Sequence, residues 1–127
     1  MITYKLEPNL SATDFADVLK RSTLSERRPT AMETLEGMVK NADIIITALD
    51  GDKLIGVSRS ISDFHYCTYL SDLAVDEAYQ KRGIGKELIR LTKQQAPEAK
   101  LILLSAPAAQ GYYPKIGMTQ FEYCFYL

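Results

Sequence analysis

The segment Gln80-Lys81-Arg82-Gly83-Ile84-Gly85 joins an apolar run at residues 70–75 to an amphipathic run at residues 86–95. The change from a continuous apolar run to helical spacing predicts a strand, a loop and a helix, in that order. Because glycine has no Cβ, Gly83 and Gly85 let a ligand come close to the backbone. Backbone N–H groups at a helix N-terminus attract anions. This segment is therefore predicted to hold a pyrophosphate.

Two other phosphate-binding signatures do not describe this loop. A nucleotide P-loop requires Gly-x-x-x-x-Gly-Lys-Ser/Thr, which is absent, and a dinucleotide fingerprint requires a third glycine where the chain has Leu88. The pattern present is Gln-x-x-Gly-x-Gly after a strand that ends in Leu73-Ala74-Val75. It resembles the coenzyme A signature of the GNAT superfamily of N-acetyltransferases. The alternative is a plain glycine-containing turn before a helix.

A second motif lies at residues 109–118. It has Ala109, the aromatic pair Tyr112 and Tyr113, and Gly117, and it resembles the closing motif of the same superfamily, Ala-x-x-Phe-Tyr-x-x-x-Gly-Phe. The resemblance implies that Tyr113 is a general acid for the departing coenzyme A thiolate. A phenol with a pKa of about 10 can donate to a thiolate whose conjugate acid has a pKa of about 8.5. The alternative is a core tyrosine with a satisfied hydroxyl group.

The resemblance also implies acetyl-coenzyme A as cosubstrate and a set of residues that bind it. The pyrophosphate lies on the backbone of the glycine loop, and the pantetheine arm pairs with the strand that ends at Val75. Where the family often has an asparagine, this chain has Ala106, so either backbone contacts suffice or Ser105 takes its place. The expected set is Leu73, Ala74, Val75, Gln80, Lys81, Arg82, Gly83, Ile84, Gly85, Lys86, Ser105 and Tyr112. No metal is expected, because the single histidine and two cysteines lack partners at ligand spacing.

In the implied reaction a primary amine attacks the thioester directly in a ternary complex. Asp72 is the first candidate for the base, because a carboxylate in an apolar strand needs a reason. The alternative is a structural carboxylate that either caps backbone donors or meets a nearby arginine. Tyr79 either relays a proton at the mouth of the loop or packs as an aromatic side chain. His65 is expected at the surface, and Arg27 and Arg28 either bind an anionic group of the acceptor or lie in a solvated loop.

The order of patterns predicts an α/β (α+β) fold. Strands are expected at residues 2–6, 43–49, 53–60, 66–75, 100–104 and 118–127, in the order β-α-α-β-β-β-α-β-α-β. That order is the GNAT order, a mixed and mostly antiparallel sheet with helices on both faces. Ser11 is expected to cap the first helix, and Thr30 with Glu33 forms a capping box for the second. The apolar strand at residues 100–104 is expected to be buried on both faces.

Composition restricts the classes of function. The 127 residues suit one domain, residues 1–127, and the net charge of −1 gives no electrostatic support for nucleic-acid binding. The charged N-terminus is no signal peptide, and no apolar run is long enough for a membrane span. A cytoplasmic protein is expected, with Cys67 and Cys124 as free thiols and Cys67 buried. The apolar C-terminal residues suit either a sheet core or a homodimer interface.

Two functions from different classes remain. The first is an acetyl-coenzyme A-dependent N-acetyltransferase, an acyltransferase that acts on a small-molecule amine or on a lysine or N-terminal amine. The second is a non-catalytic domain that binds acetyl-coenzyme A as a sensor or interaction module. A sensor needs neither a leaving-group acid nor a base, so Tyr113 and Asp72 discriminate between the two.

Overall fold

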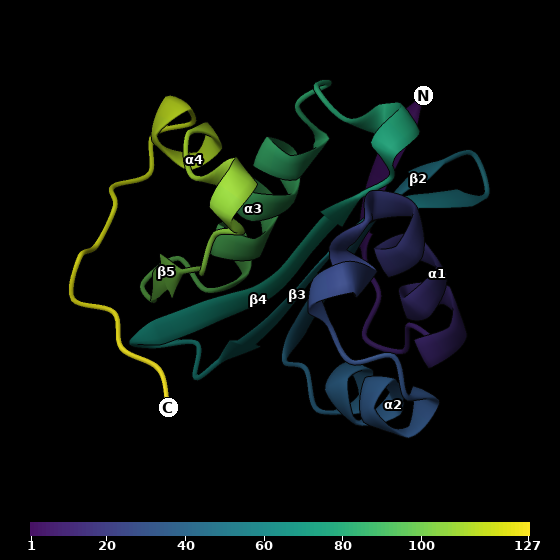
Figure 1. Ribbon diagram of the computed structural model, residues 1–127, viewed down its shortest axis with the longest axis horizontal. Coiled ribbons are helices and arrows are strands. Elements are labelled where there is room, and N and C mark those ends of the chain that lie inside the picture. Colours follow the sequence, from purple (N-terminus) through teal and green to yellow (C-terminus); the bar gives the residue numbers. More distant parts are fainter.

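The computed structural model describes residues 1–127, and a five-stranded sheet with the order β1-β2-β3-β4-β5 runs through its centre (Figure 1). The first four strands are antiparallel and β5 pairs in parallel with β4. The strands are β1 at Ile2–Leu6, β2 at Ile44–Asp50, β3 at Lys53–Ser62, β4 at Cys67–Val75 and β5 at Lys100–Ile102. The mixed sheet confirms the predicted fold class.

Helices cover both faces of this sheet (Figure 1). The helices are α1 at Ala12–Ser22, α2 at Met32–Lys40, α3 at Ile84–Gln95 and α4 at Tyr112–Lys115. Short 3-10 helices lie at Leu24–Arg27, Glu77–Tyr79 and Pro107–Ala109. One core joins α1 and α2 to the sheet through Phe15 and Leu35, and a second joins α3 to the opposite face through Leu88. The sheet is thus fixed from both sides.

The ends of the first two helices differ in how they are capped. Ser11 caps α1, and its hydroxyl group accepts from the backbone N–H of Asp14 at 3.1 Å, as predicted. The capping box predicted for α2 is wrong. Ala31 is the N-cap residue and makes no side-chain bond, so Thr30 stands one position too early for its hydroxyl to reach the first turn.

A bulge in β4 shapes the sheet beside the glycine loop. Arg59 pairs with Asp72 and Ser60 with Leu70, so Ser71 has no register partner. A bulge bends its strand and increases the local twist. β4 pairs with β5 only from Cys67 to Tyr69, so the stretch from Leu73 to Val75 has a strand neighbour on one side alone. The backbone there is open toward α3 and α4.

The edge of the sheet at β5 departs from three expectations. No strand forms over residues 118–127, so β5 is the edge of the sheet. For that reason β5 is not buried on both faces, and Ile102 and the following Leu104 are 50% and 54% exposed. Cys67 is exposed instead of buried, because it starts β4 next to this short edge strand.

Candidate active site

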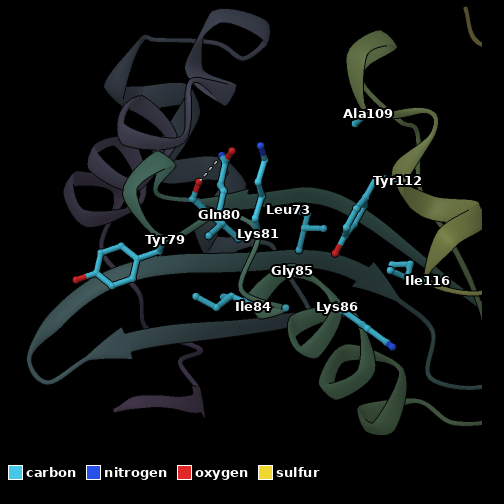
Figure 2. A pocket seen from close by; sticks show the side chains of 12 residues that line it. Leu73, Tyr79, Gln80, Lys81, Ile84, Gly85, Lys86, Ala109, Tyr112 and Ile116 are labelled. Carbon is cyan, nitrogen blue, oxygen red and sulfur yellow. Dashed lines mark hydrogen bonds between the residues drawn. The ribbon is translucent and has the colours of Figure 1, made fainter.

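A cavity of about 490 Å³ opens between the end of β4, the first turn of α3 and α4 (Figure 2). β4 supplies its floor, the loop before α3 supplies one wall, and α4 supplies the opposite wall. The lining residues are Leu73, Val75, Tyr79, Gln80, Lys81, Gly83, Ile84, Gly85, Lys86, Ala109, Tyr112 and Ile116. Ten of these are predicted site residues. Ala109 and Ile116 lacked an assigned role, although the closing motif contains both positions.

The loop before α3 has an unusual backbone conformation. Lys81 and Gly83 both adopt a left-handed φ, of 65° and 80°, and Gly83 is the N-cap residue of α3. The side-chain amide of Gln80 donates to the carbonyl oxygen of Val75 at 3.0 Å, which ties the loop to β4 (Figure 2). A glycine N-cap offers no side-chain acceptor, so the first-turn N–H groups of α3 keep capacity for a ligand.

The space at Gly85 fits an anion that lies close to the backbone. A Cβ atom at this position would stand 3.3 Å from the hydroxyl oxygen of Tyr112 and 3.8 Å from Cδ2 of Leu73. A side chain here would therefore fill the space between α3, Tyr112 and Leu73. Small residues at Gly83 and Gly85 leave the N-terminus of α3 accessible, as a pyrophosphate requires.

Basic side chains surround the mouth of the cavity. Lys81 and Lys86 line it, and Arg82 lies outside its wall, with its guanidinium carbon 5.1 Å from the ring centre of Tyr79. Lys53 approaches the same ring, with its ammonium nitrogen 5.5 Å from the centre. None of these four cations forms an ion pair with a carboxylate. Their combined charge favours an anionic ligand.

Tyr79 lines the cavity with its ring, while its hydroxyl group points outward (Figure 2). That hydroxyl donates to the carboxylate of Asp50 at 2.7 Å. The bond raises the pKa of Tyr79 and lowers the pKa of Asp50. A tyrosine held in this way connects the loop to the β2–β3 turn, so the geometry favours the packing role over a proton relay.

The two tyrosines of α4 occupy different places. Tyr112 reaches into the cavity, with its hydroxyl group beside Gly85 and Leu73 (Figure 2). Tyr113 is half-buried outside the lining, with its ring edge-on to Tyr112 at 5.2 Å between centroids and 75° between planes. Burial raises the pKa of both phenols. The motif resemblance assigns the acid to Tyr113, yet the hydroxyl group in the cavity belongs to Tyr112.

Asp72 lies on the other side of β4, fully buried. Its two carboxylate oxygens accept from Nε of Arg28 and Nε of Arg59. Both arginines also bond to Ser71, Arg28 to its carbonyl oxygen at 2.8 Å and Arg59 to its hydroxyl oxygen at 3.0 Å. This is the structural arrangement that the sequence left open for Asp72. Arg28 likewise points inward instead of serving the acceptor or lying free in solvent.

Two other expected site residues, Ala74 and Ser105, lie outside the lining, as do His65 and the two cysteines. The side chain of Ala74 belongs to the core beneath α1, so Ala74 can serve the cavity only through its backbone. The hydroxyl group of Ser105 bonds to the carbonyl oxygen of Ala106 at 2.7 Å, which occupies it locally. His65 is exposed in the β3–β4 turn, as predicted. Cys67 and Cys124 are free thiols, also as predicted.

The structure contains no group of three or more His, Cys, Asp or Glu side chains that could hold a metal ion. None of its helices has both the length and the apolar character that a membrane span requires.

Comparisons with known proteins agree with this geometry. A model of the acetyltransferase (GNAT) family matches residues 12–118. A GNAT family acetyltransferase from Streptococcus pneumoniae is 27% identical, with a TM-score of 0.80 over 94% of this chain and 88% of that one. A probable acetyltransferase from meticillin-resistant Staphylococcus aureus has the same fold at 23% identity, with a TM-score of 0.80 over 100% and 98% of the two chains.

One curated relative is similar to this chain in sequence. It is an uncharacterised N-acetyltransferase, ycf52, from Pyropia yezoensis, 29% identical over 86 residues. The match spans 62% of this chain and 49%, about half, of the length of that relative.

Proposed function

Because the chain belongs to the acetyltransferase (GNAT) family, we propose that it transfers the acetyl group of acetyl-coenzyme A to a primary amine. The acceptor is a small molecule or a peptide amine, and residues 1–127 act as one domain. The observation that carries the proposal is the cavity itself. It combines a glycine-rich helix N-terminus, unpaired cations and an open strand backbone in one place.

The pyrophosphate binds at the first turn of α3. The N-cap residue Gly83 supplies no side-chain acceptor to the first-turn N–H groups, and the absent Cβ at Gly85 leaves room for phosphoryl oxygens. Lys81 and Lys86 neutralise the remaining charge from the walls of the cavity.

The pantetheine arm extends along β4. Beyond Tyr69 that strand has no neighbour on the β5 side, so the backbone groups from Leu73 to Val75 can pair with the amides of an extended ligand. This arrangement directs the thioester away from α3 and toward the divergence of β4 and β5.

The reaction is a direct transfer. The amine nitrogen forms a bond to the thioester carbonyl carbon, the carbon–sulfur bond breaks, and the leaving thiolate takes a proton. The nitrogen loses one proton to water, and this proton replaces the one that sulfur receives. A backbone N–H near Leu73 faces the oxyanion that forms in between, and a tyrosine of α4 supplies the proton to sulfur. Asp72 contributes by holding the bulge of β4 and its arginine partners, and not as the base.

Calorimetric titration of acetyl-coenzyme A tests the proposal. Wild type is expected to bind in the micromolar range, and Gly83→Trp is expected to abolish binding by filling the cradle. Gly51→Trp is the matched control, because Gly51 has a similar left-handed φ of 61° and its turn contributes no residue to the cavity. Absence of binding by folded wild type, or an equal loss of affinity in both variants, would refute the proposed pyrophosphate site at Gly83 and Gly85.

A non-catalytic sensor is the second candidate. It is favoured by the placement of Asp72, which is bonded to two arginines, and of Tyr113, which lies outside the cavity. A panel of amines with continuous detection of free thiol separates the two functions. Thiol release that depends on an amine supports the enzyme, and tight binding without release supports the sensor.

The proposal includes a homodimer in the cytoplasm. Four aromatic residues of the C-terminal segment are 70–94% exposed, namely Phe121, Tyr123, Phe125 and Tyr126. They lie next in sequence to α4, and β5 presents an unpaired edge. Apolar surface of this extent favours association. Unpaired thiols accord with a reducing compartment.

A further inference from the structure

The hydroxyl group of Tyr112 stands where an anion bound at α3 would stand. Its oxygen is 3.3 Å from the position that a Cβ would take at Gly85, a residue in the first turn of α3 (Figure 2). The backbone N–H of Lys86 faces this oxygen and stabilises its charged form, which opposes the effect of burial on the pKa. The ligand-free cradle thus already contains one oxygen acceptor, supplied by the protein.

A phosphoryl oxygen and the Tyr112 hydroxyl would need the same donor. We propose that Tyr112 is a positioning residue that occupies the cradle in the free protein and is displaced by the pyrophosphate of acetyl-coenzyme A. This inference rests on the proposed function. It assigns to Tyr112 a role opposite to that of an ordinary ligand contact, because its hydroxyl group competes with the ligand instead of binding it.

Displacement of Tyr112 has a consequence for Tyr113. Successive residues in a helix are about 100° apart, so a rotation of α4 that withdraws Tyr112 brings Tyr113 toward the cavity. α4 has only four residues, none of them fully buried, and glycines flank it at Gly111 and Gly117. Such an element can turn at a small cost in buried area. The leaving-group acid then enters the cavity only when the cosubstrate is in place.

Tyr112→Phe tests the competition directly. The variant keeps the ring and its edge-on contact with Tyr113 but removes the oxygen. Since the hydroxyl oxygen no longer occupies the space beside Gly85, the Kd for acetyl-coenzyme A is expected to fall about two- to tenfold, the range of one modest polar contact. Tyr123→Phe is the matched control, because Tyr123 forms a similar edge-on pair with Phe121 at 5.4 Å outside the cavity.

Fluorine NMR of protein labelled with 3-fluorotyrosine tests the exchange of the two rings. The chain has eight tyrosines, and single Phe variants assign the resonances of Tyr112 and Tyr113. Both resonances are expected to shift when acetyl-coenzyme A is added. In Tyr112→Phe, the Tyr113 resonance of the free protein is expected to lie closer to its bound position.

Three results would overturn the inference in distinguishable ways. Weaker binding by Tyr112→Phe, with wild type binding normally, makes Tyr112 a ligand contact and leaves the proposed function intact. If the Tyr113 resonance does not shift when acetyl-coenzyme A is added, the proposed rotation of α4 is refuted. Absence of binding by both wild type and variant refutes the proposed function, and this inference with it.

Discussion

Arg59 and Asp72 are register partners across β3 and β4, and their side chains form a buried ion pair next to the bulge at Ser71. Arg28 reaches the same carboxylate from the connection between α1 and α2, 44 residues away in sequence. One carboxylate therefore fixes the strand that floors the cavity to the segment that precedes α2. Because both of its oxygens accept from arginines, we expect loss of this carboxylate to lower the stability of the fold.

Asp72→Asn is expected to lower the free energy of unfolding by about 3–5 kcal/mol, because it leaves two arginines without their buried partner. Urea denaturation at neutral pH measures the change. Asp17→Asn is the control, since the pair of Asp17 with Arg21 is exposed and should contribute less than about 1 kcal/mol. Equal effects in the two variants would contradict the structural role of Asp72.

The hydrogen bonds of Asp63 predict that the stability of the fold depends on pH. Its carboxylate accepts from the backbone N–H groups of Tyr66, His65 and Cys67, and these bonds lower its pKa to about 2. A lowered pKa contributes stability that is present above the unfolded value of 3.8 and is lost as the pH falls toward 2. Carbon-detected NMR titration should place the midpoint near 2, and a midpoint near 4 would show that the turn does not form these bonds in solution.

The cations at the mouth of the cavity predict a salt effect on binding. Arg82→Ala and Lys81→Ala should each weaken acetyl-coenzyme A binding about two- to fivefold at low salt, and less at 0.5 M NaCl, because exposed charges are screened. Titrations at the two salt concentrations measure this difference. Lys20→Ala removes an exposed charge from α1, remote from the cavity, and should leave Kd unchanged at both. A salt-independent loss in Arg82→Ala would mean that the side chain acts by packing on Tyr79.

The edge of β5 predicts how the chain associates. Light scattering after gel filtration should give the mass of a dimer, and the double variant Ile102→Lys/Leu104→Lys should give a monomer, because charge on an edge strand blocks pairing. Leu6→Lys is the matched control on β1, the opposite edge, where Leu6 is 51% exposed. A monomeric wild type, or dissociation by Leu6→Lys alone, would exclude the β5 edge as the interface.

The parts of the structure that sequence predicted are those determined locally. The glycine loop and α3 follow from the spacing of Gly83, Gly85 and the apolar residues after them, which need no distant partner. The role of Asp72 was undecided because Arg28 and Arg59 become its neighbours only in the folded sheet.

The two tyrosines of α4 show a second reason why sequence does not predict the whole site. Tyr112 and Tyr113 are adjacent, so their chemistry and sequence context are nearly the same, and only the orientation of α4 decides which one enters the cavity. The strand expected at residues 118–127 fails for a related reason. Its alternating aromatic residues favour extended structure, but a strand also needs an edge that accepts it.

The three-residue ladder between β4 and β5 has a further consequence. The only strand pairing after α3 is this short ladder, whereas β2 and β3 are paired along most of their length. Amide protons of β5 and α4 should therefore exchange with deuterium well before those of β2 and β3. Over evolutionary time, such an arrangement lets the C-terminal wall of the cavity change its sequence without disturbing β2 and β3.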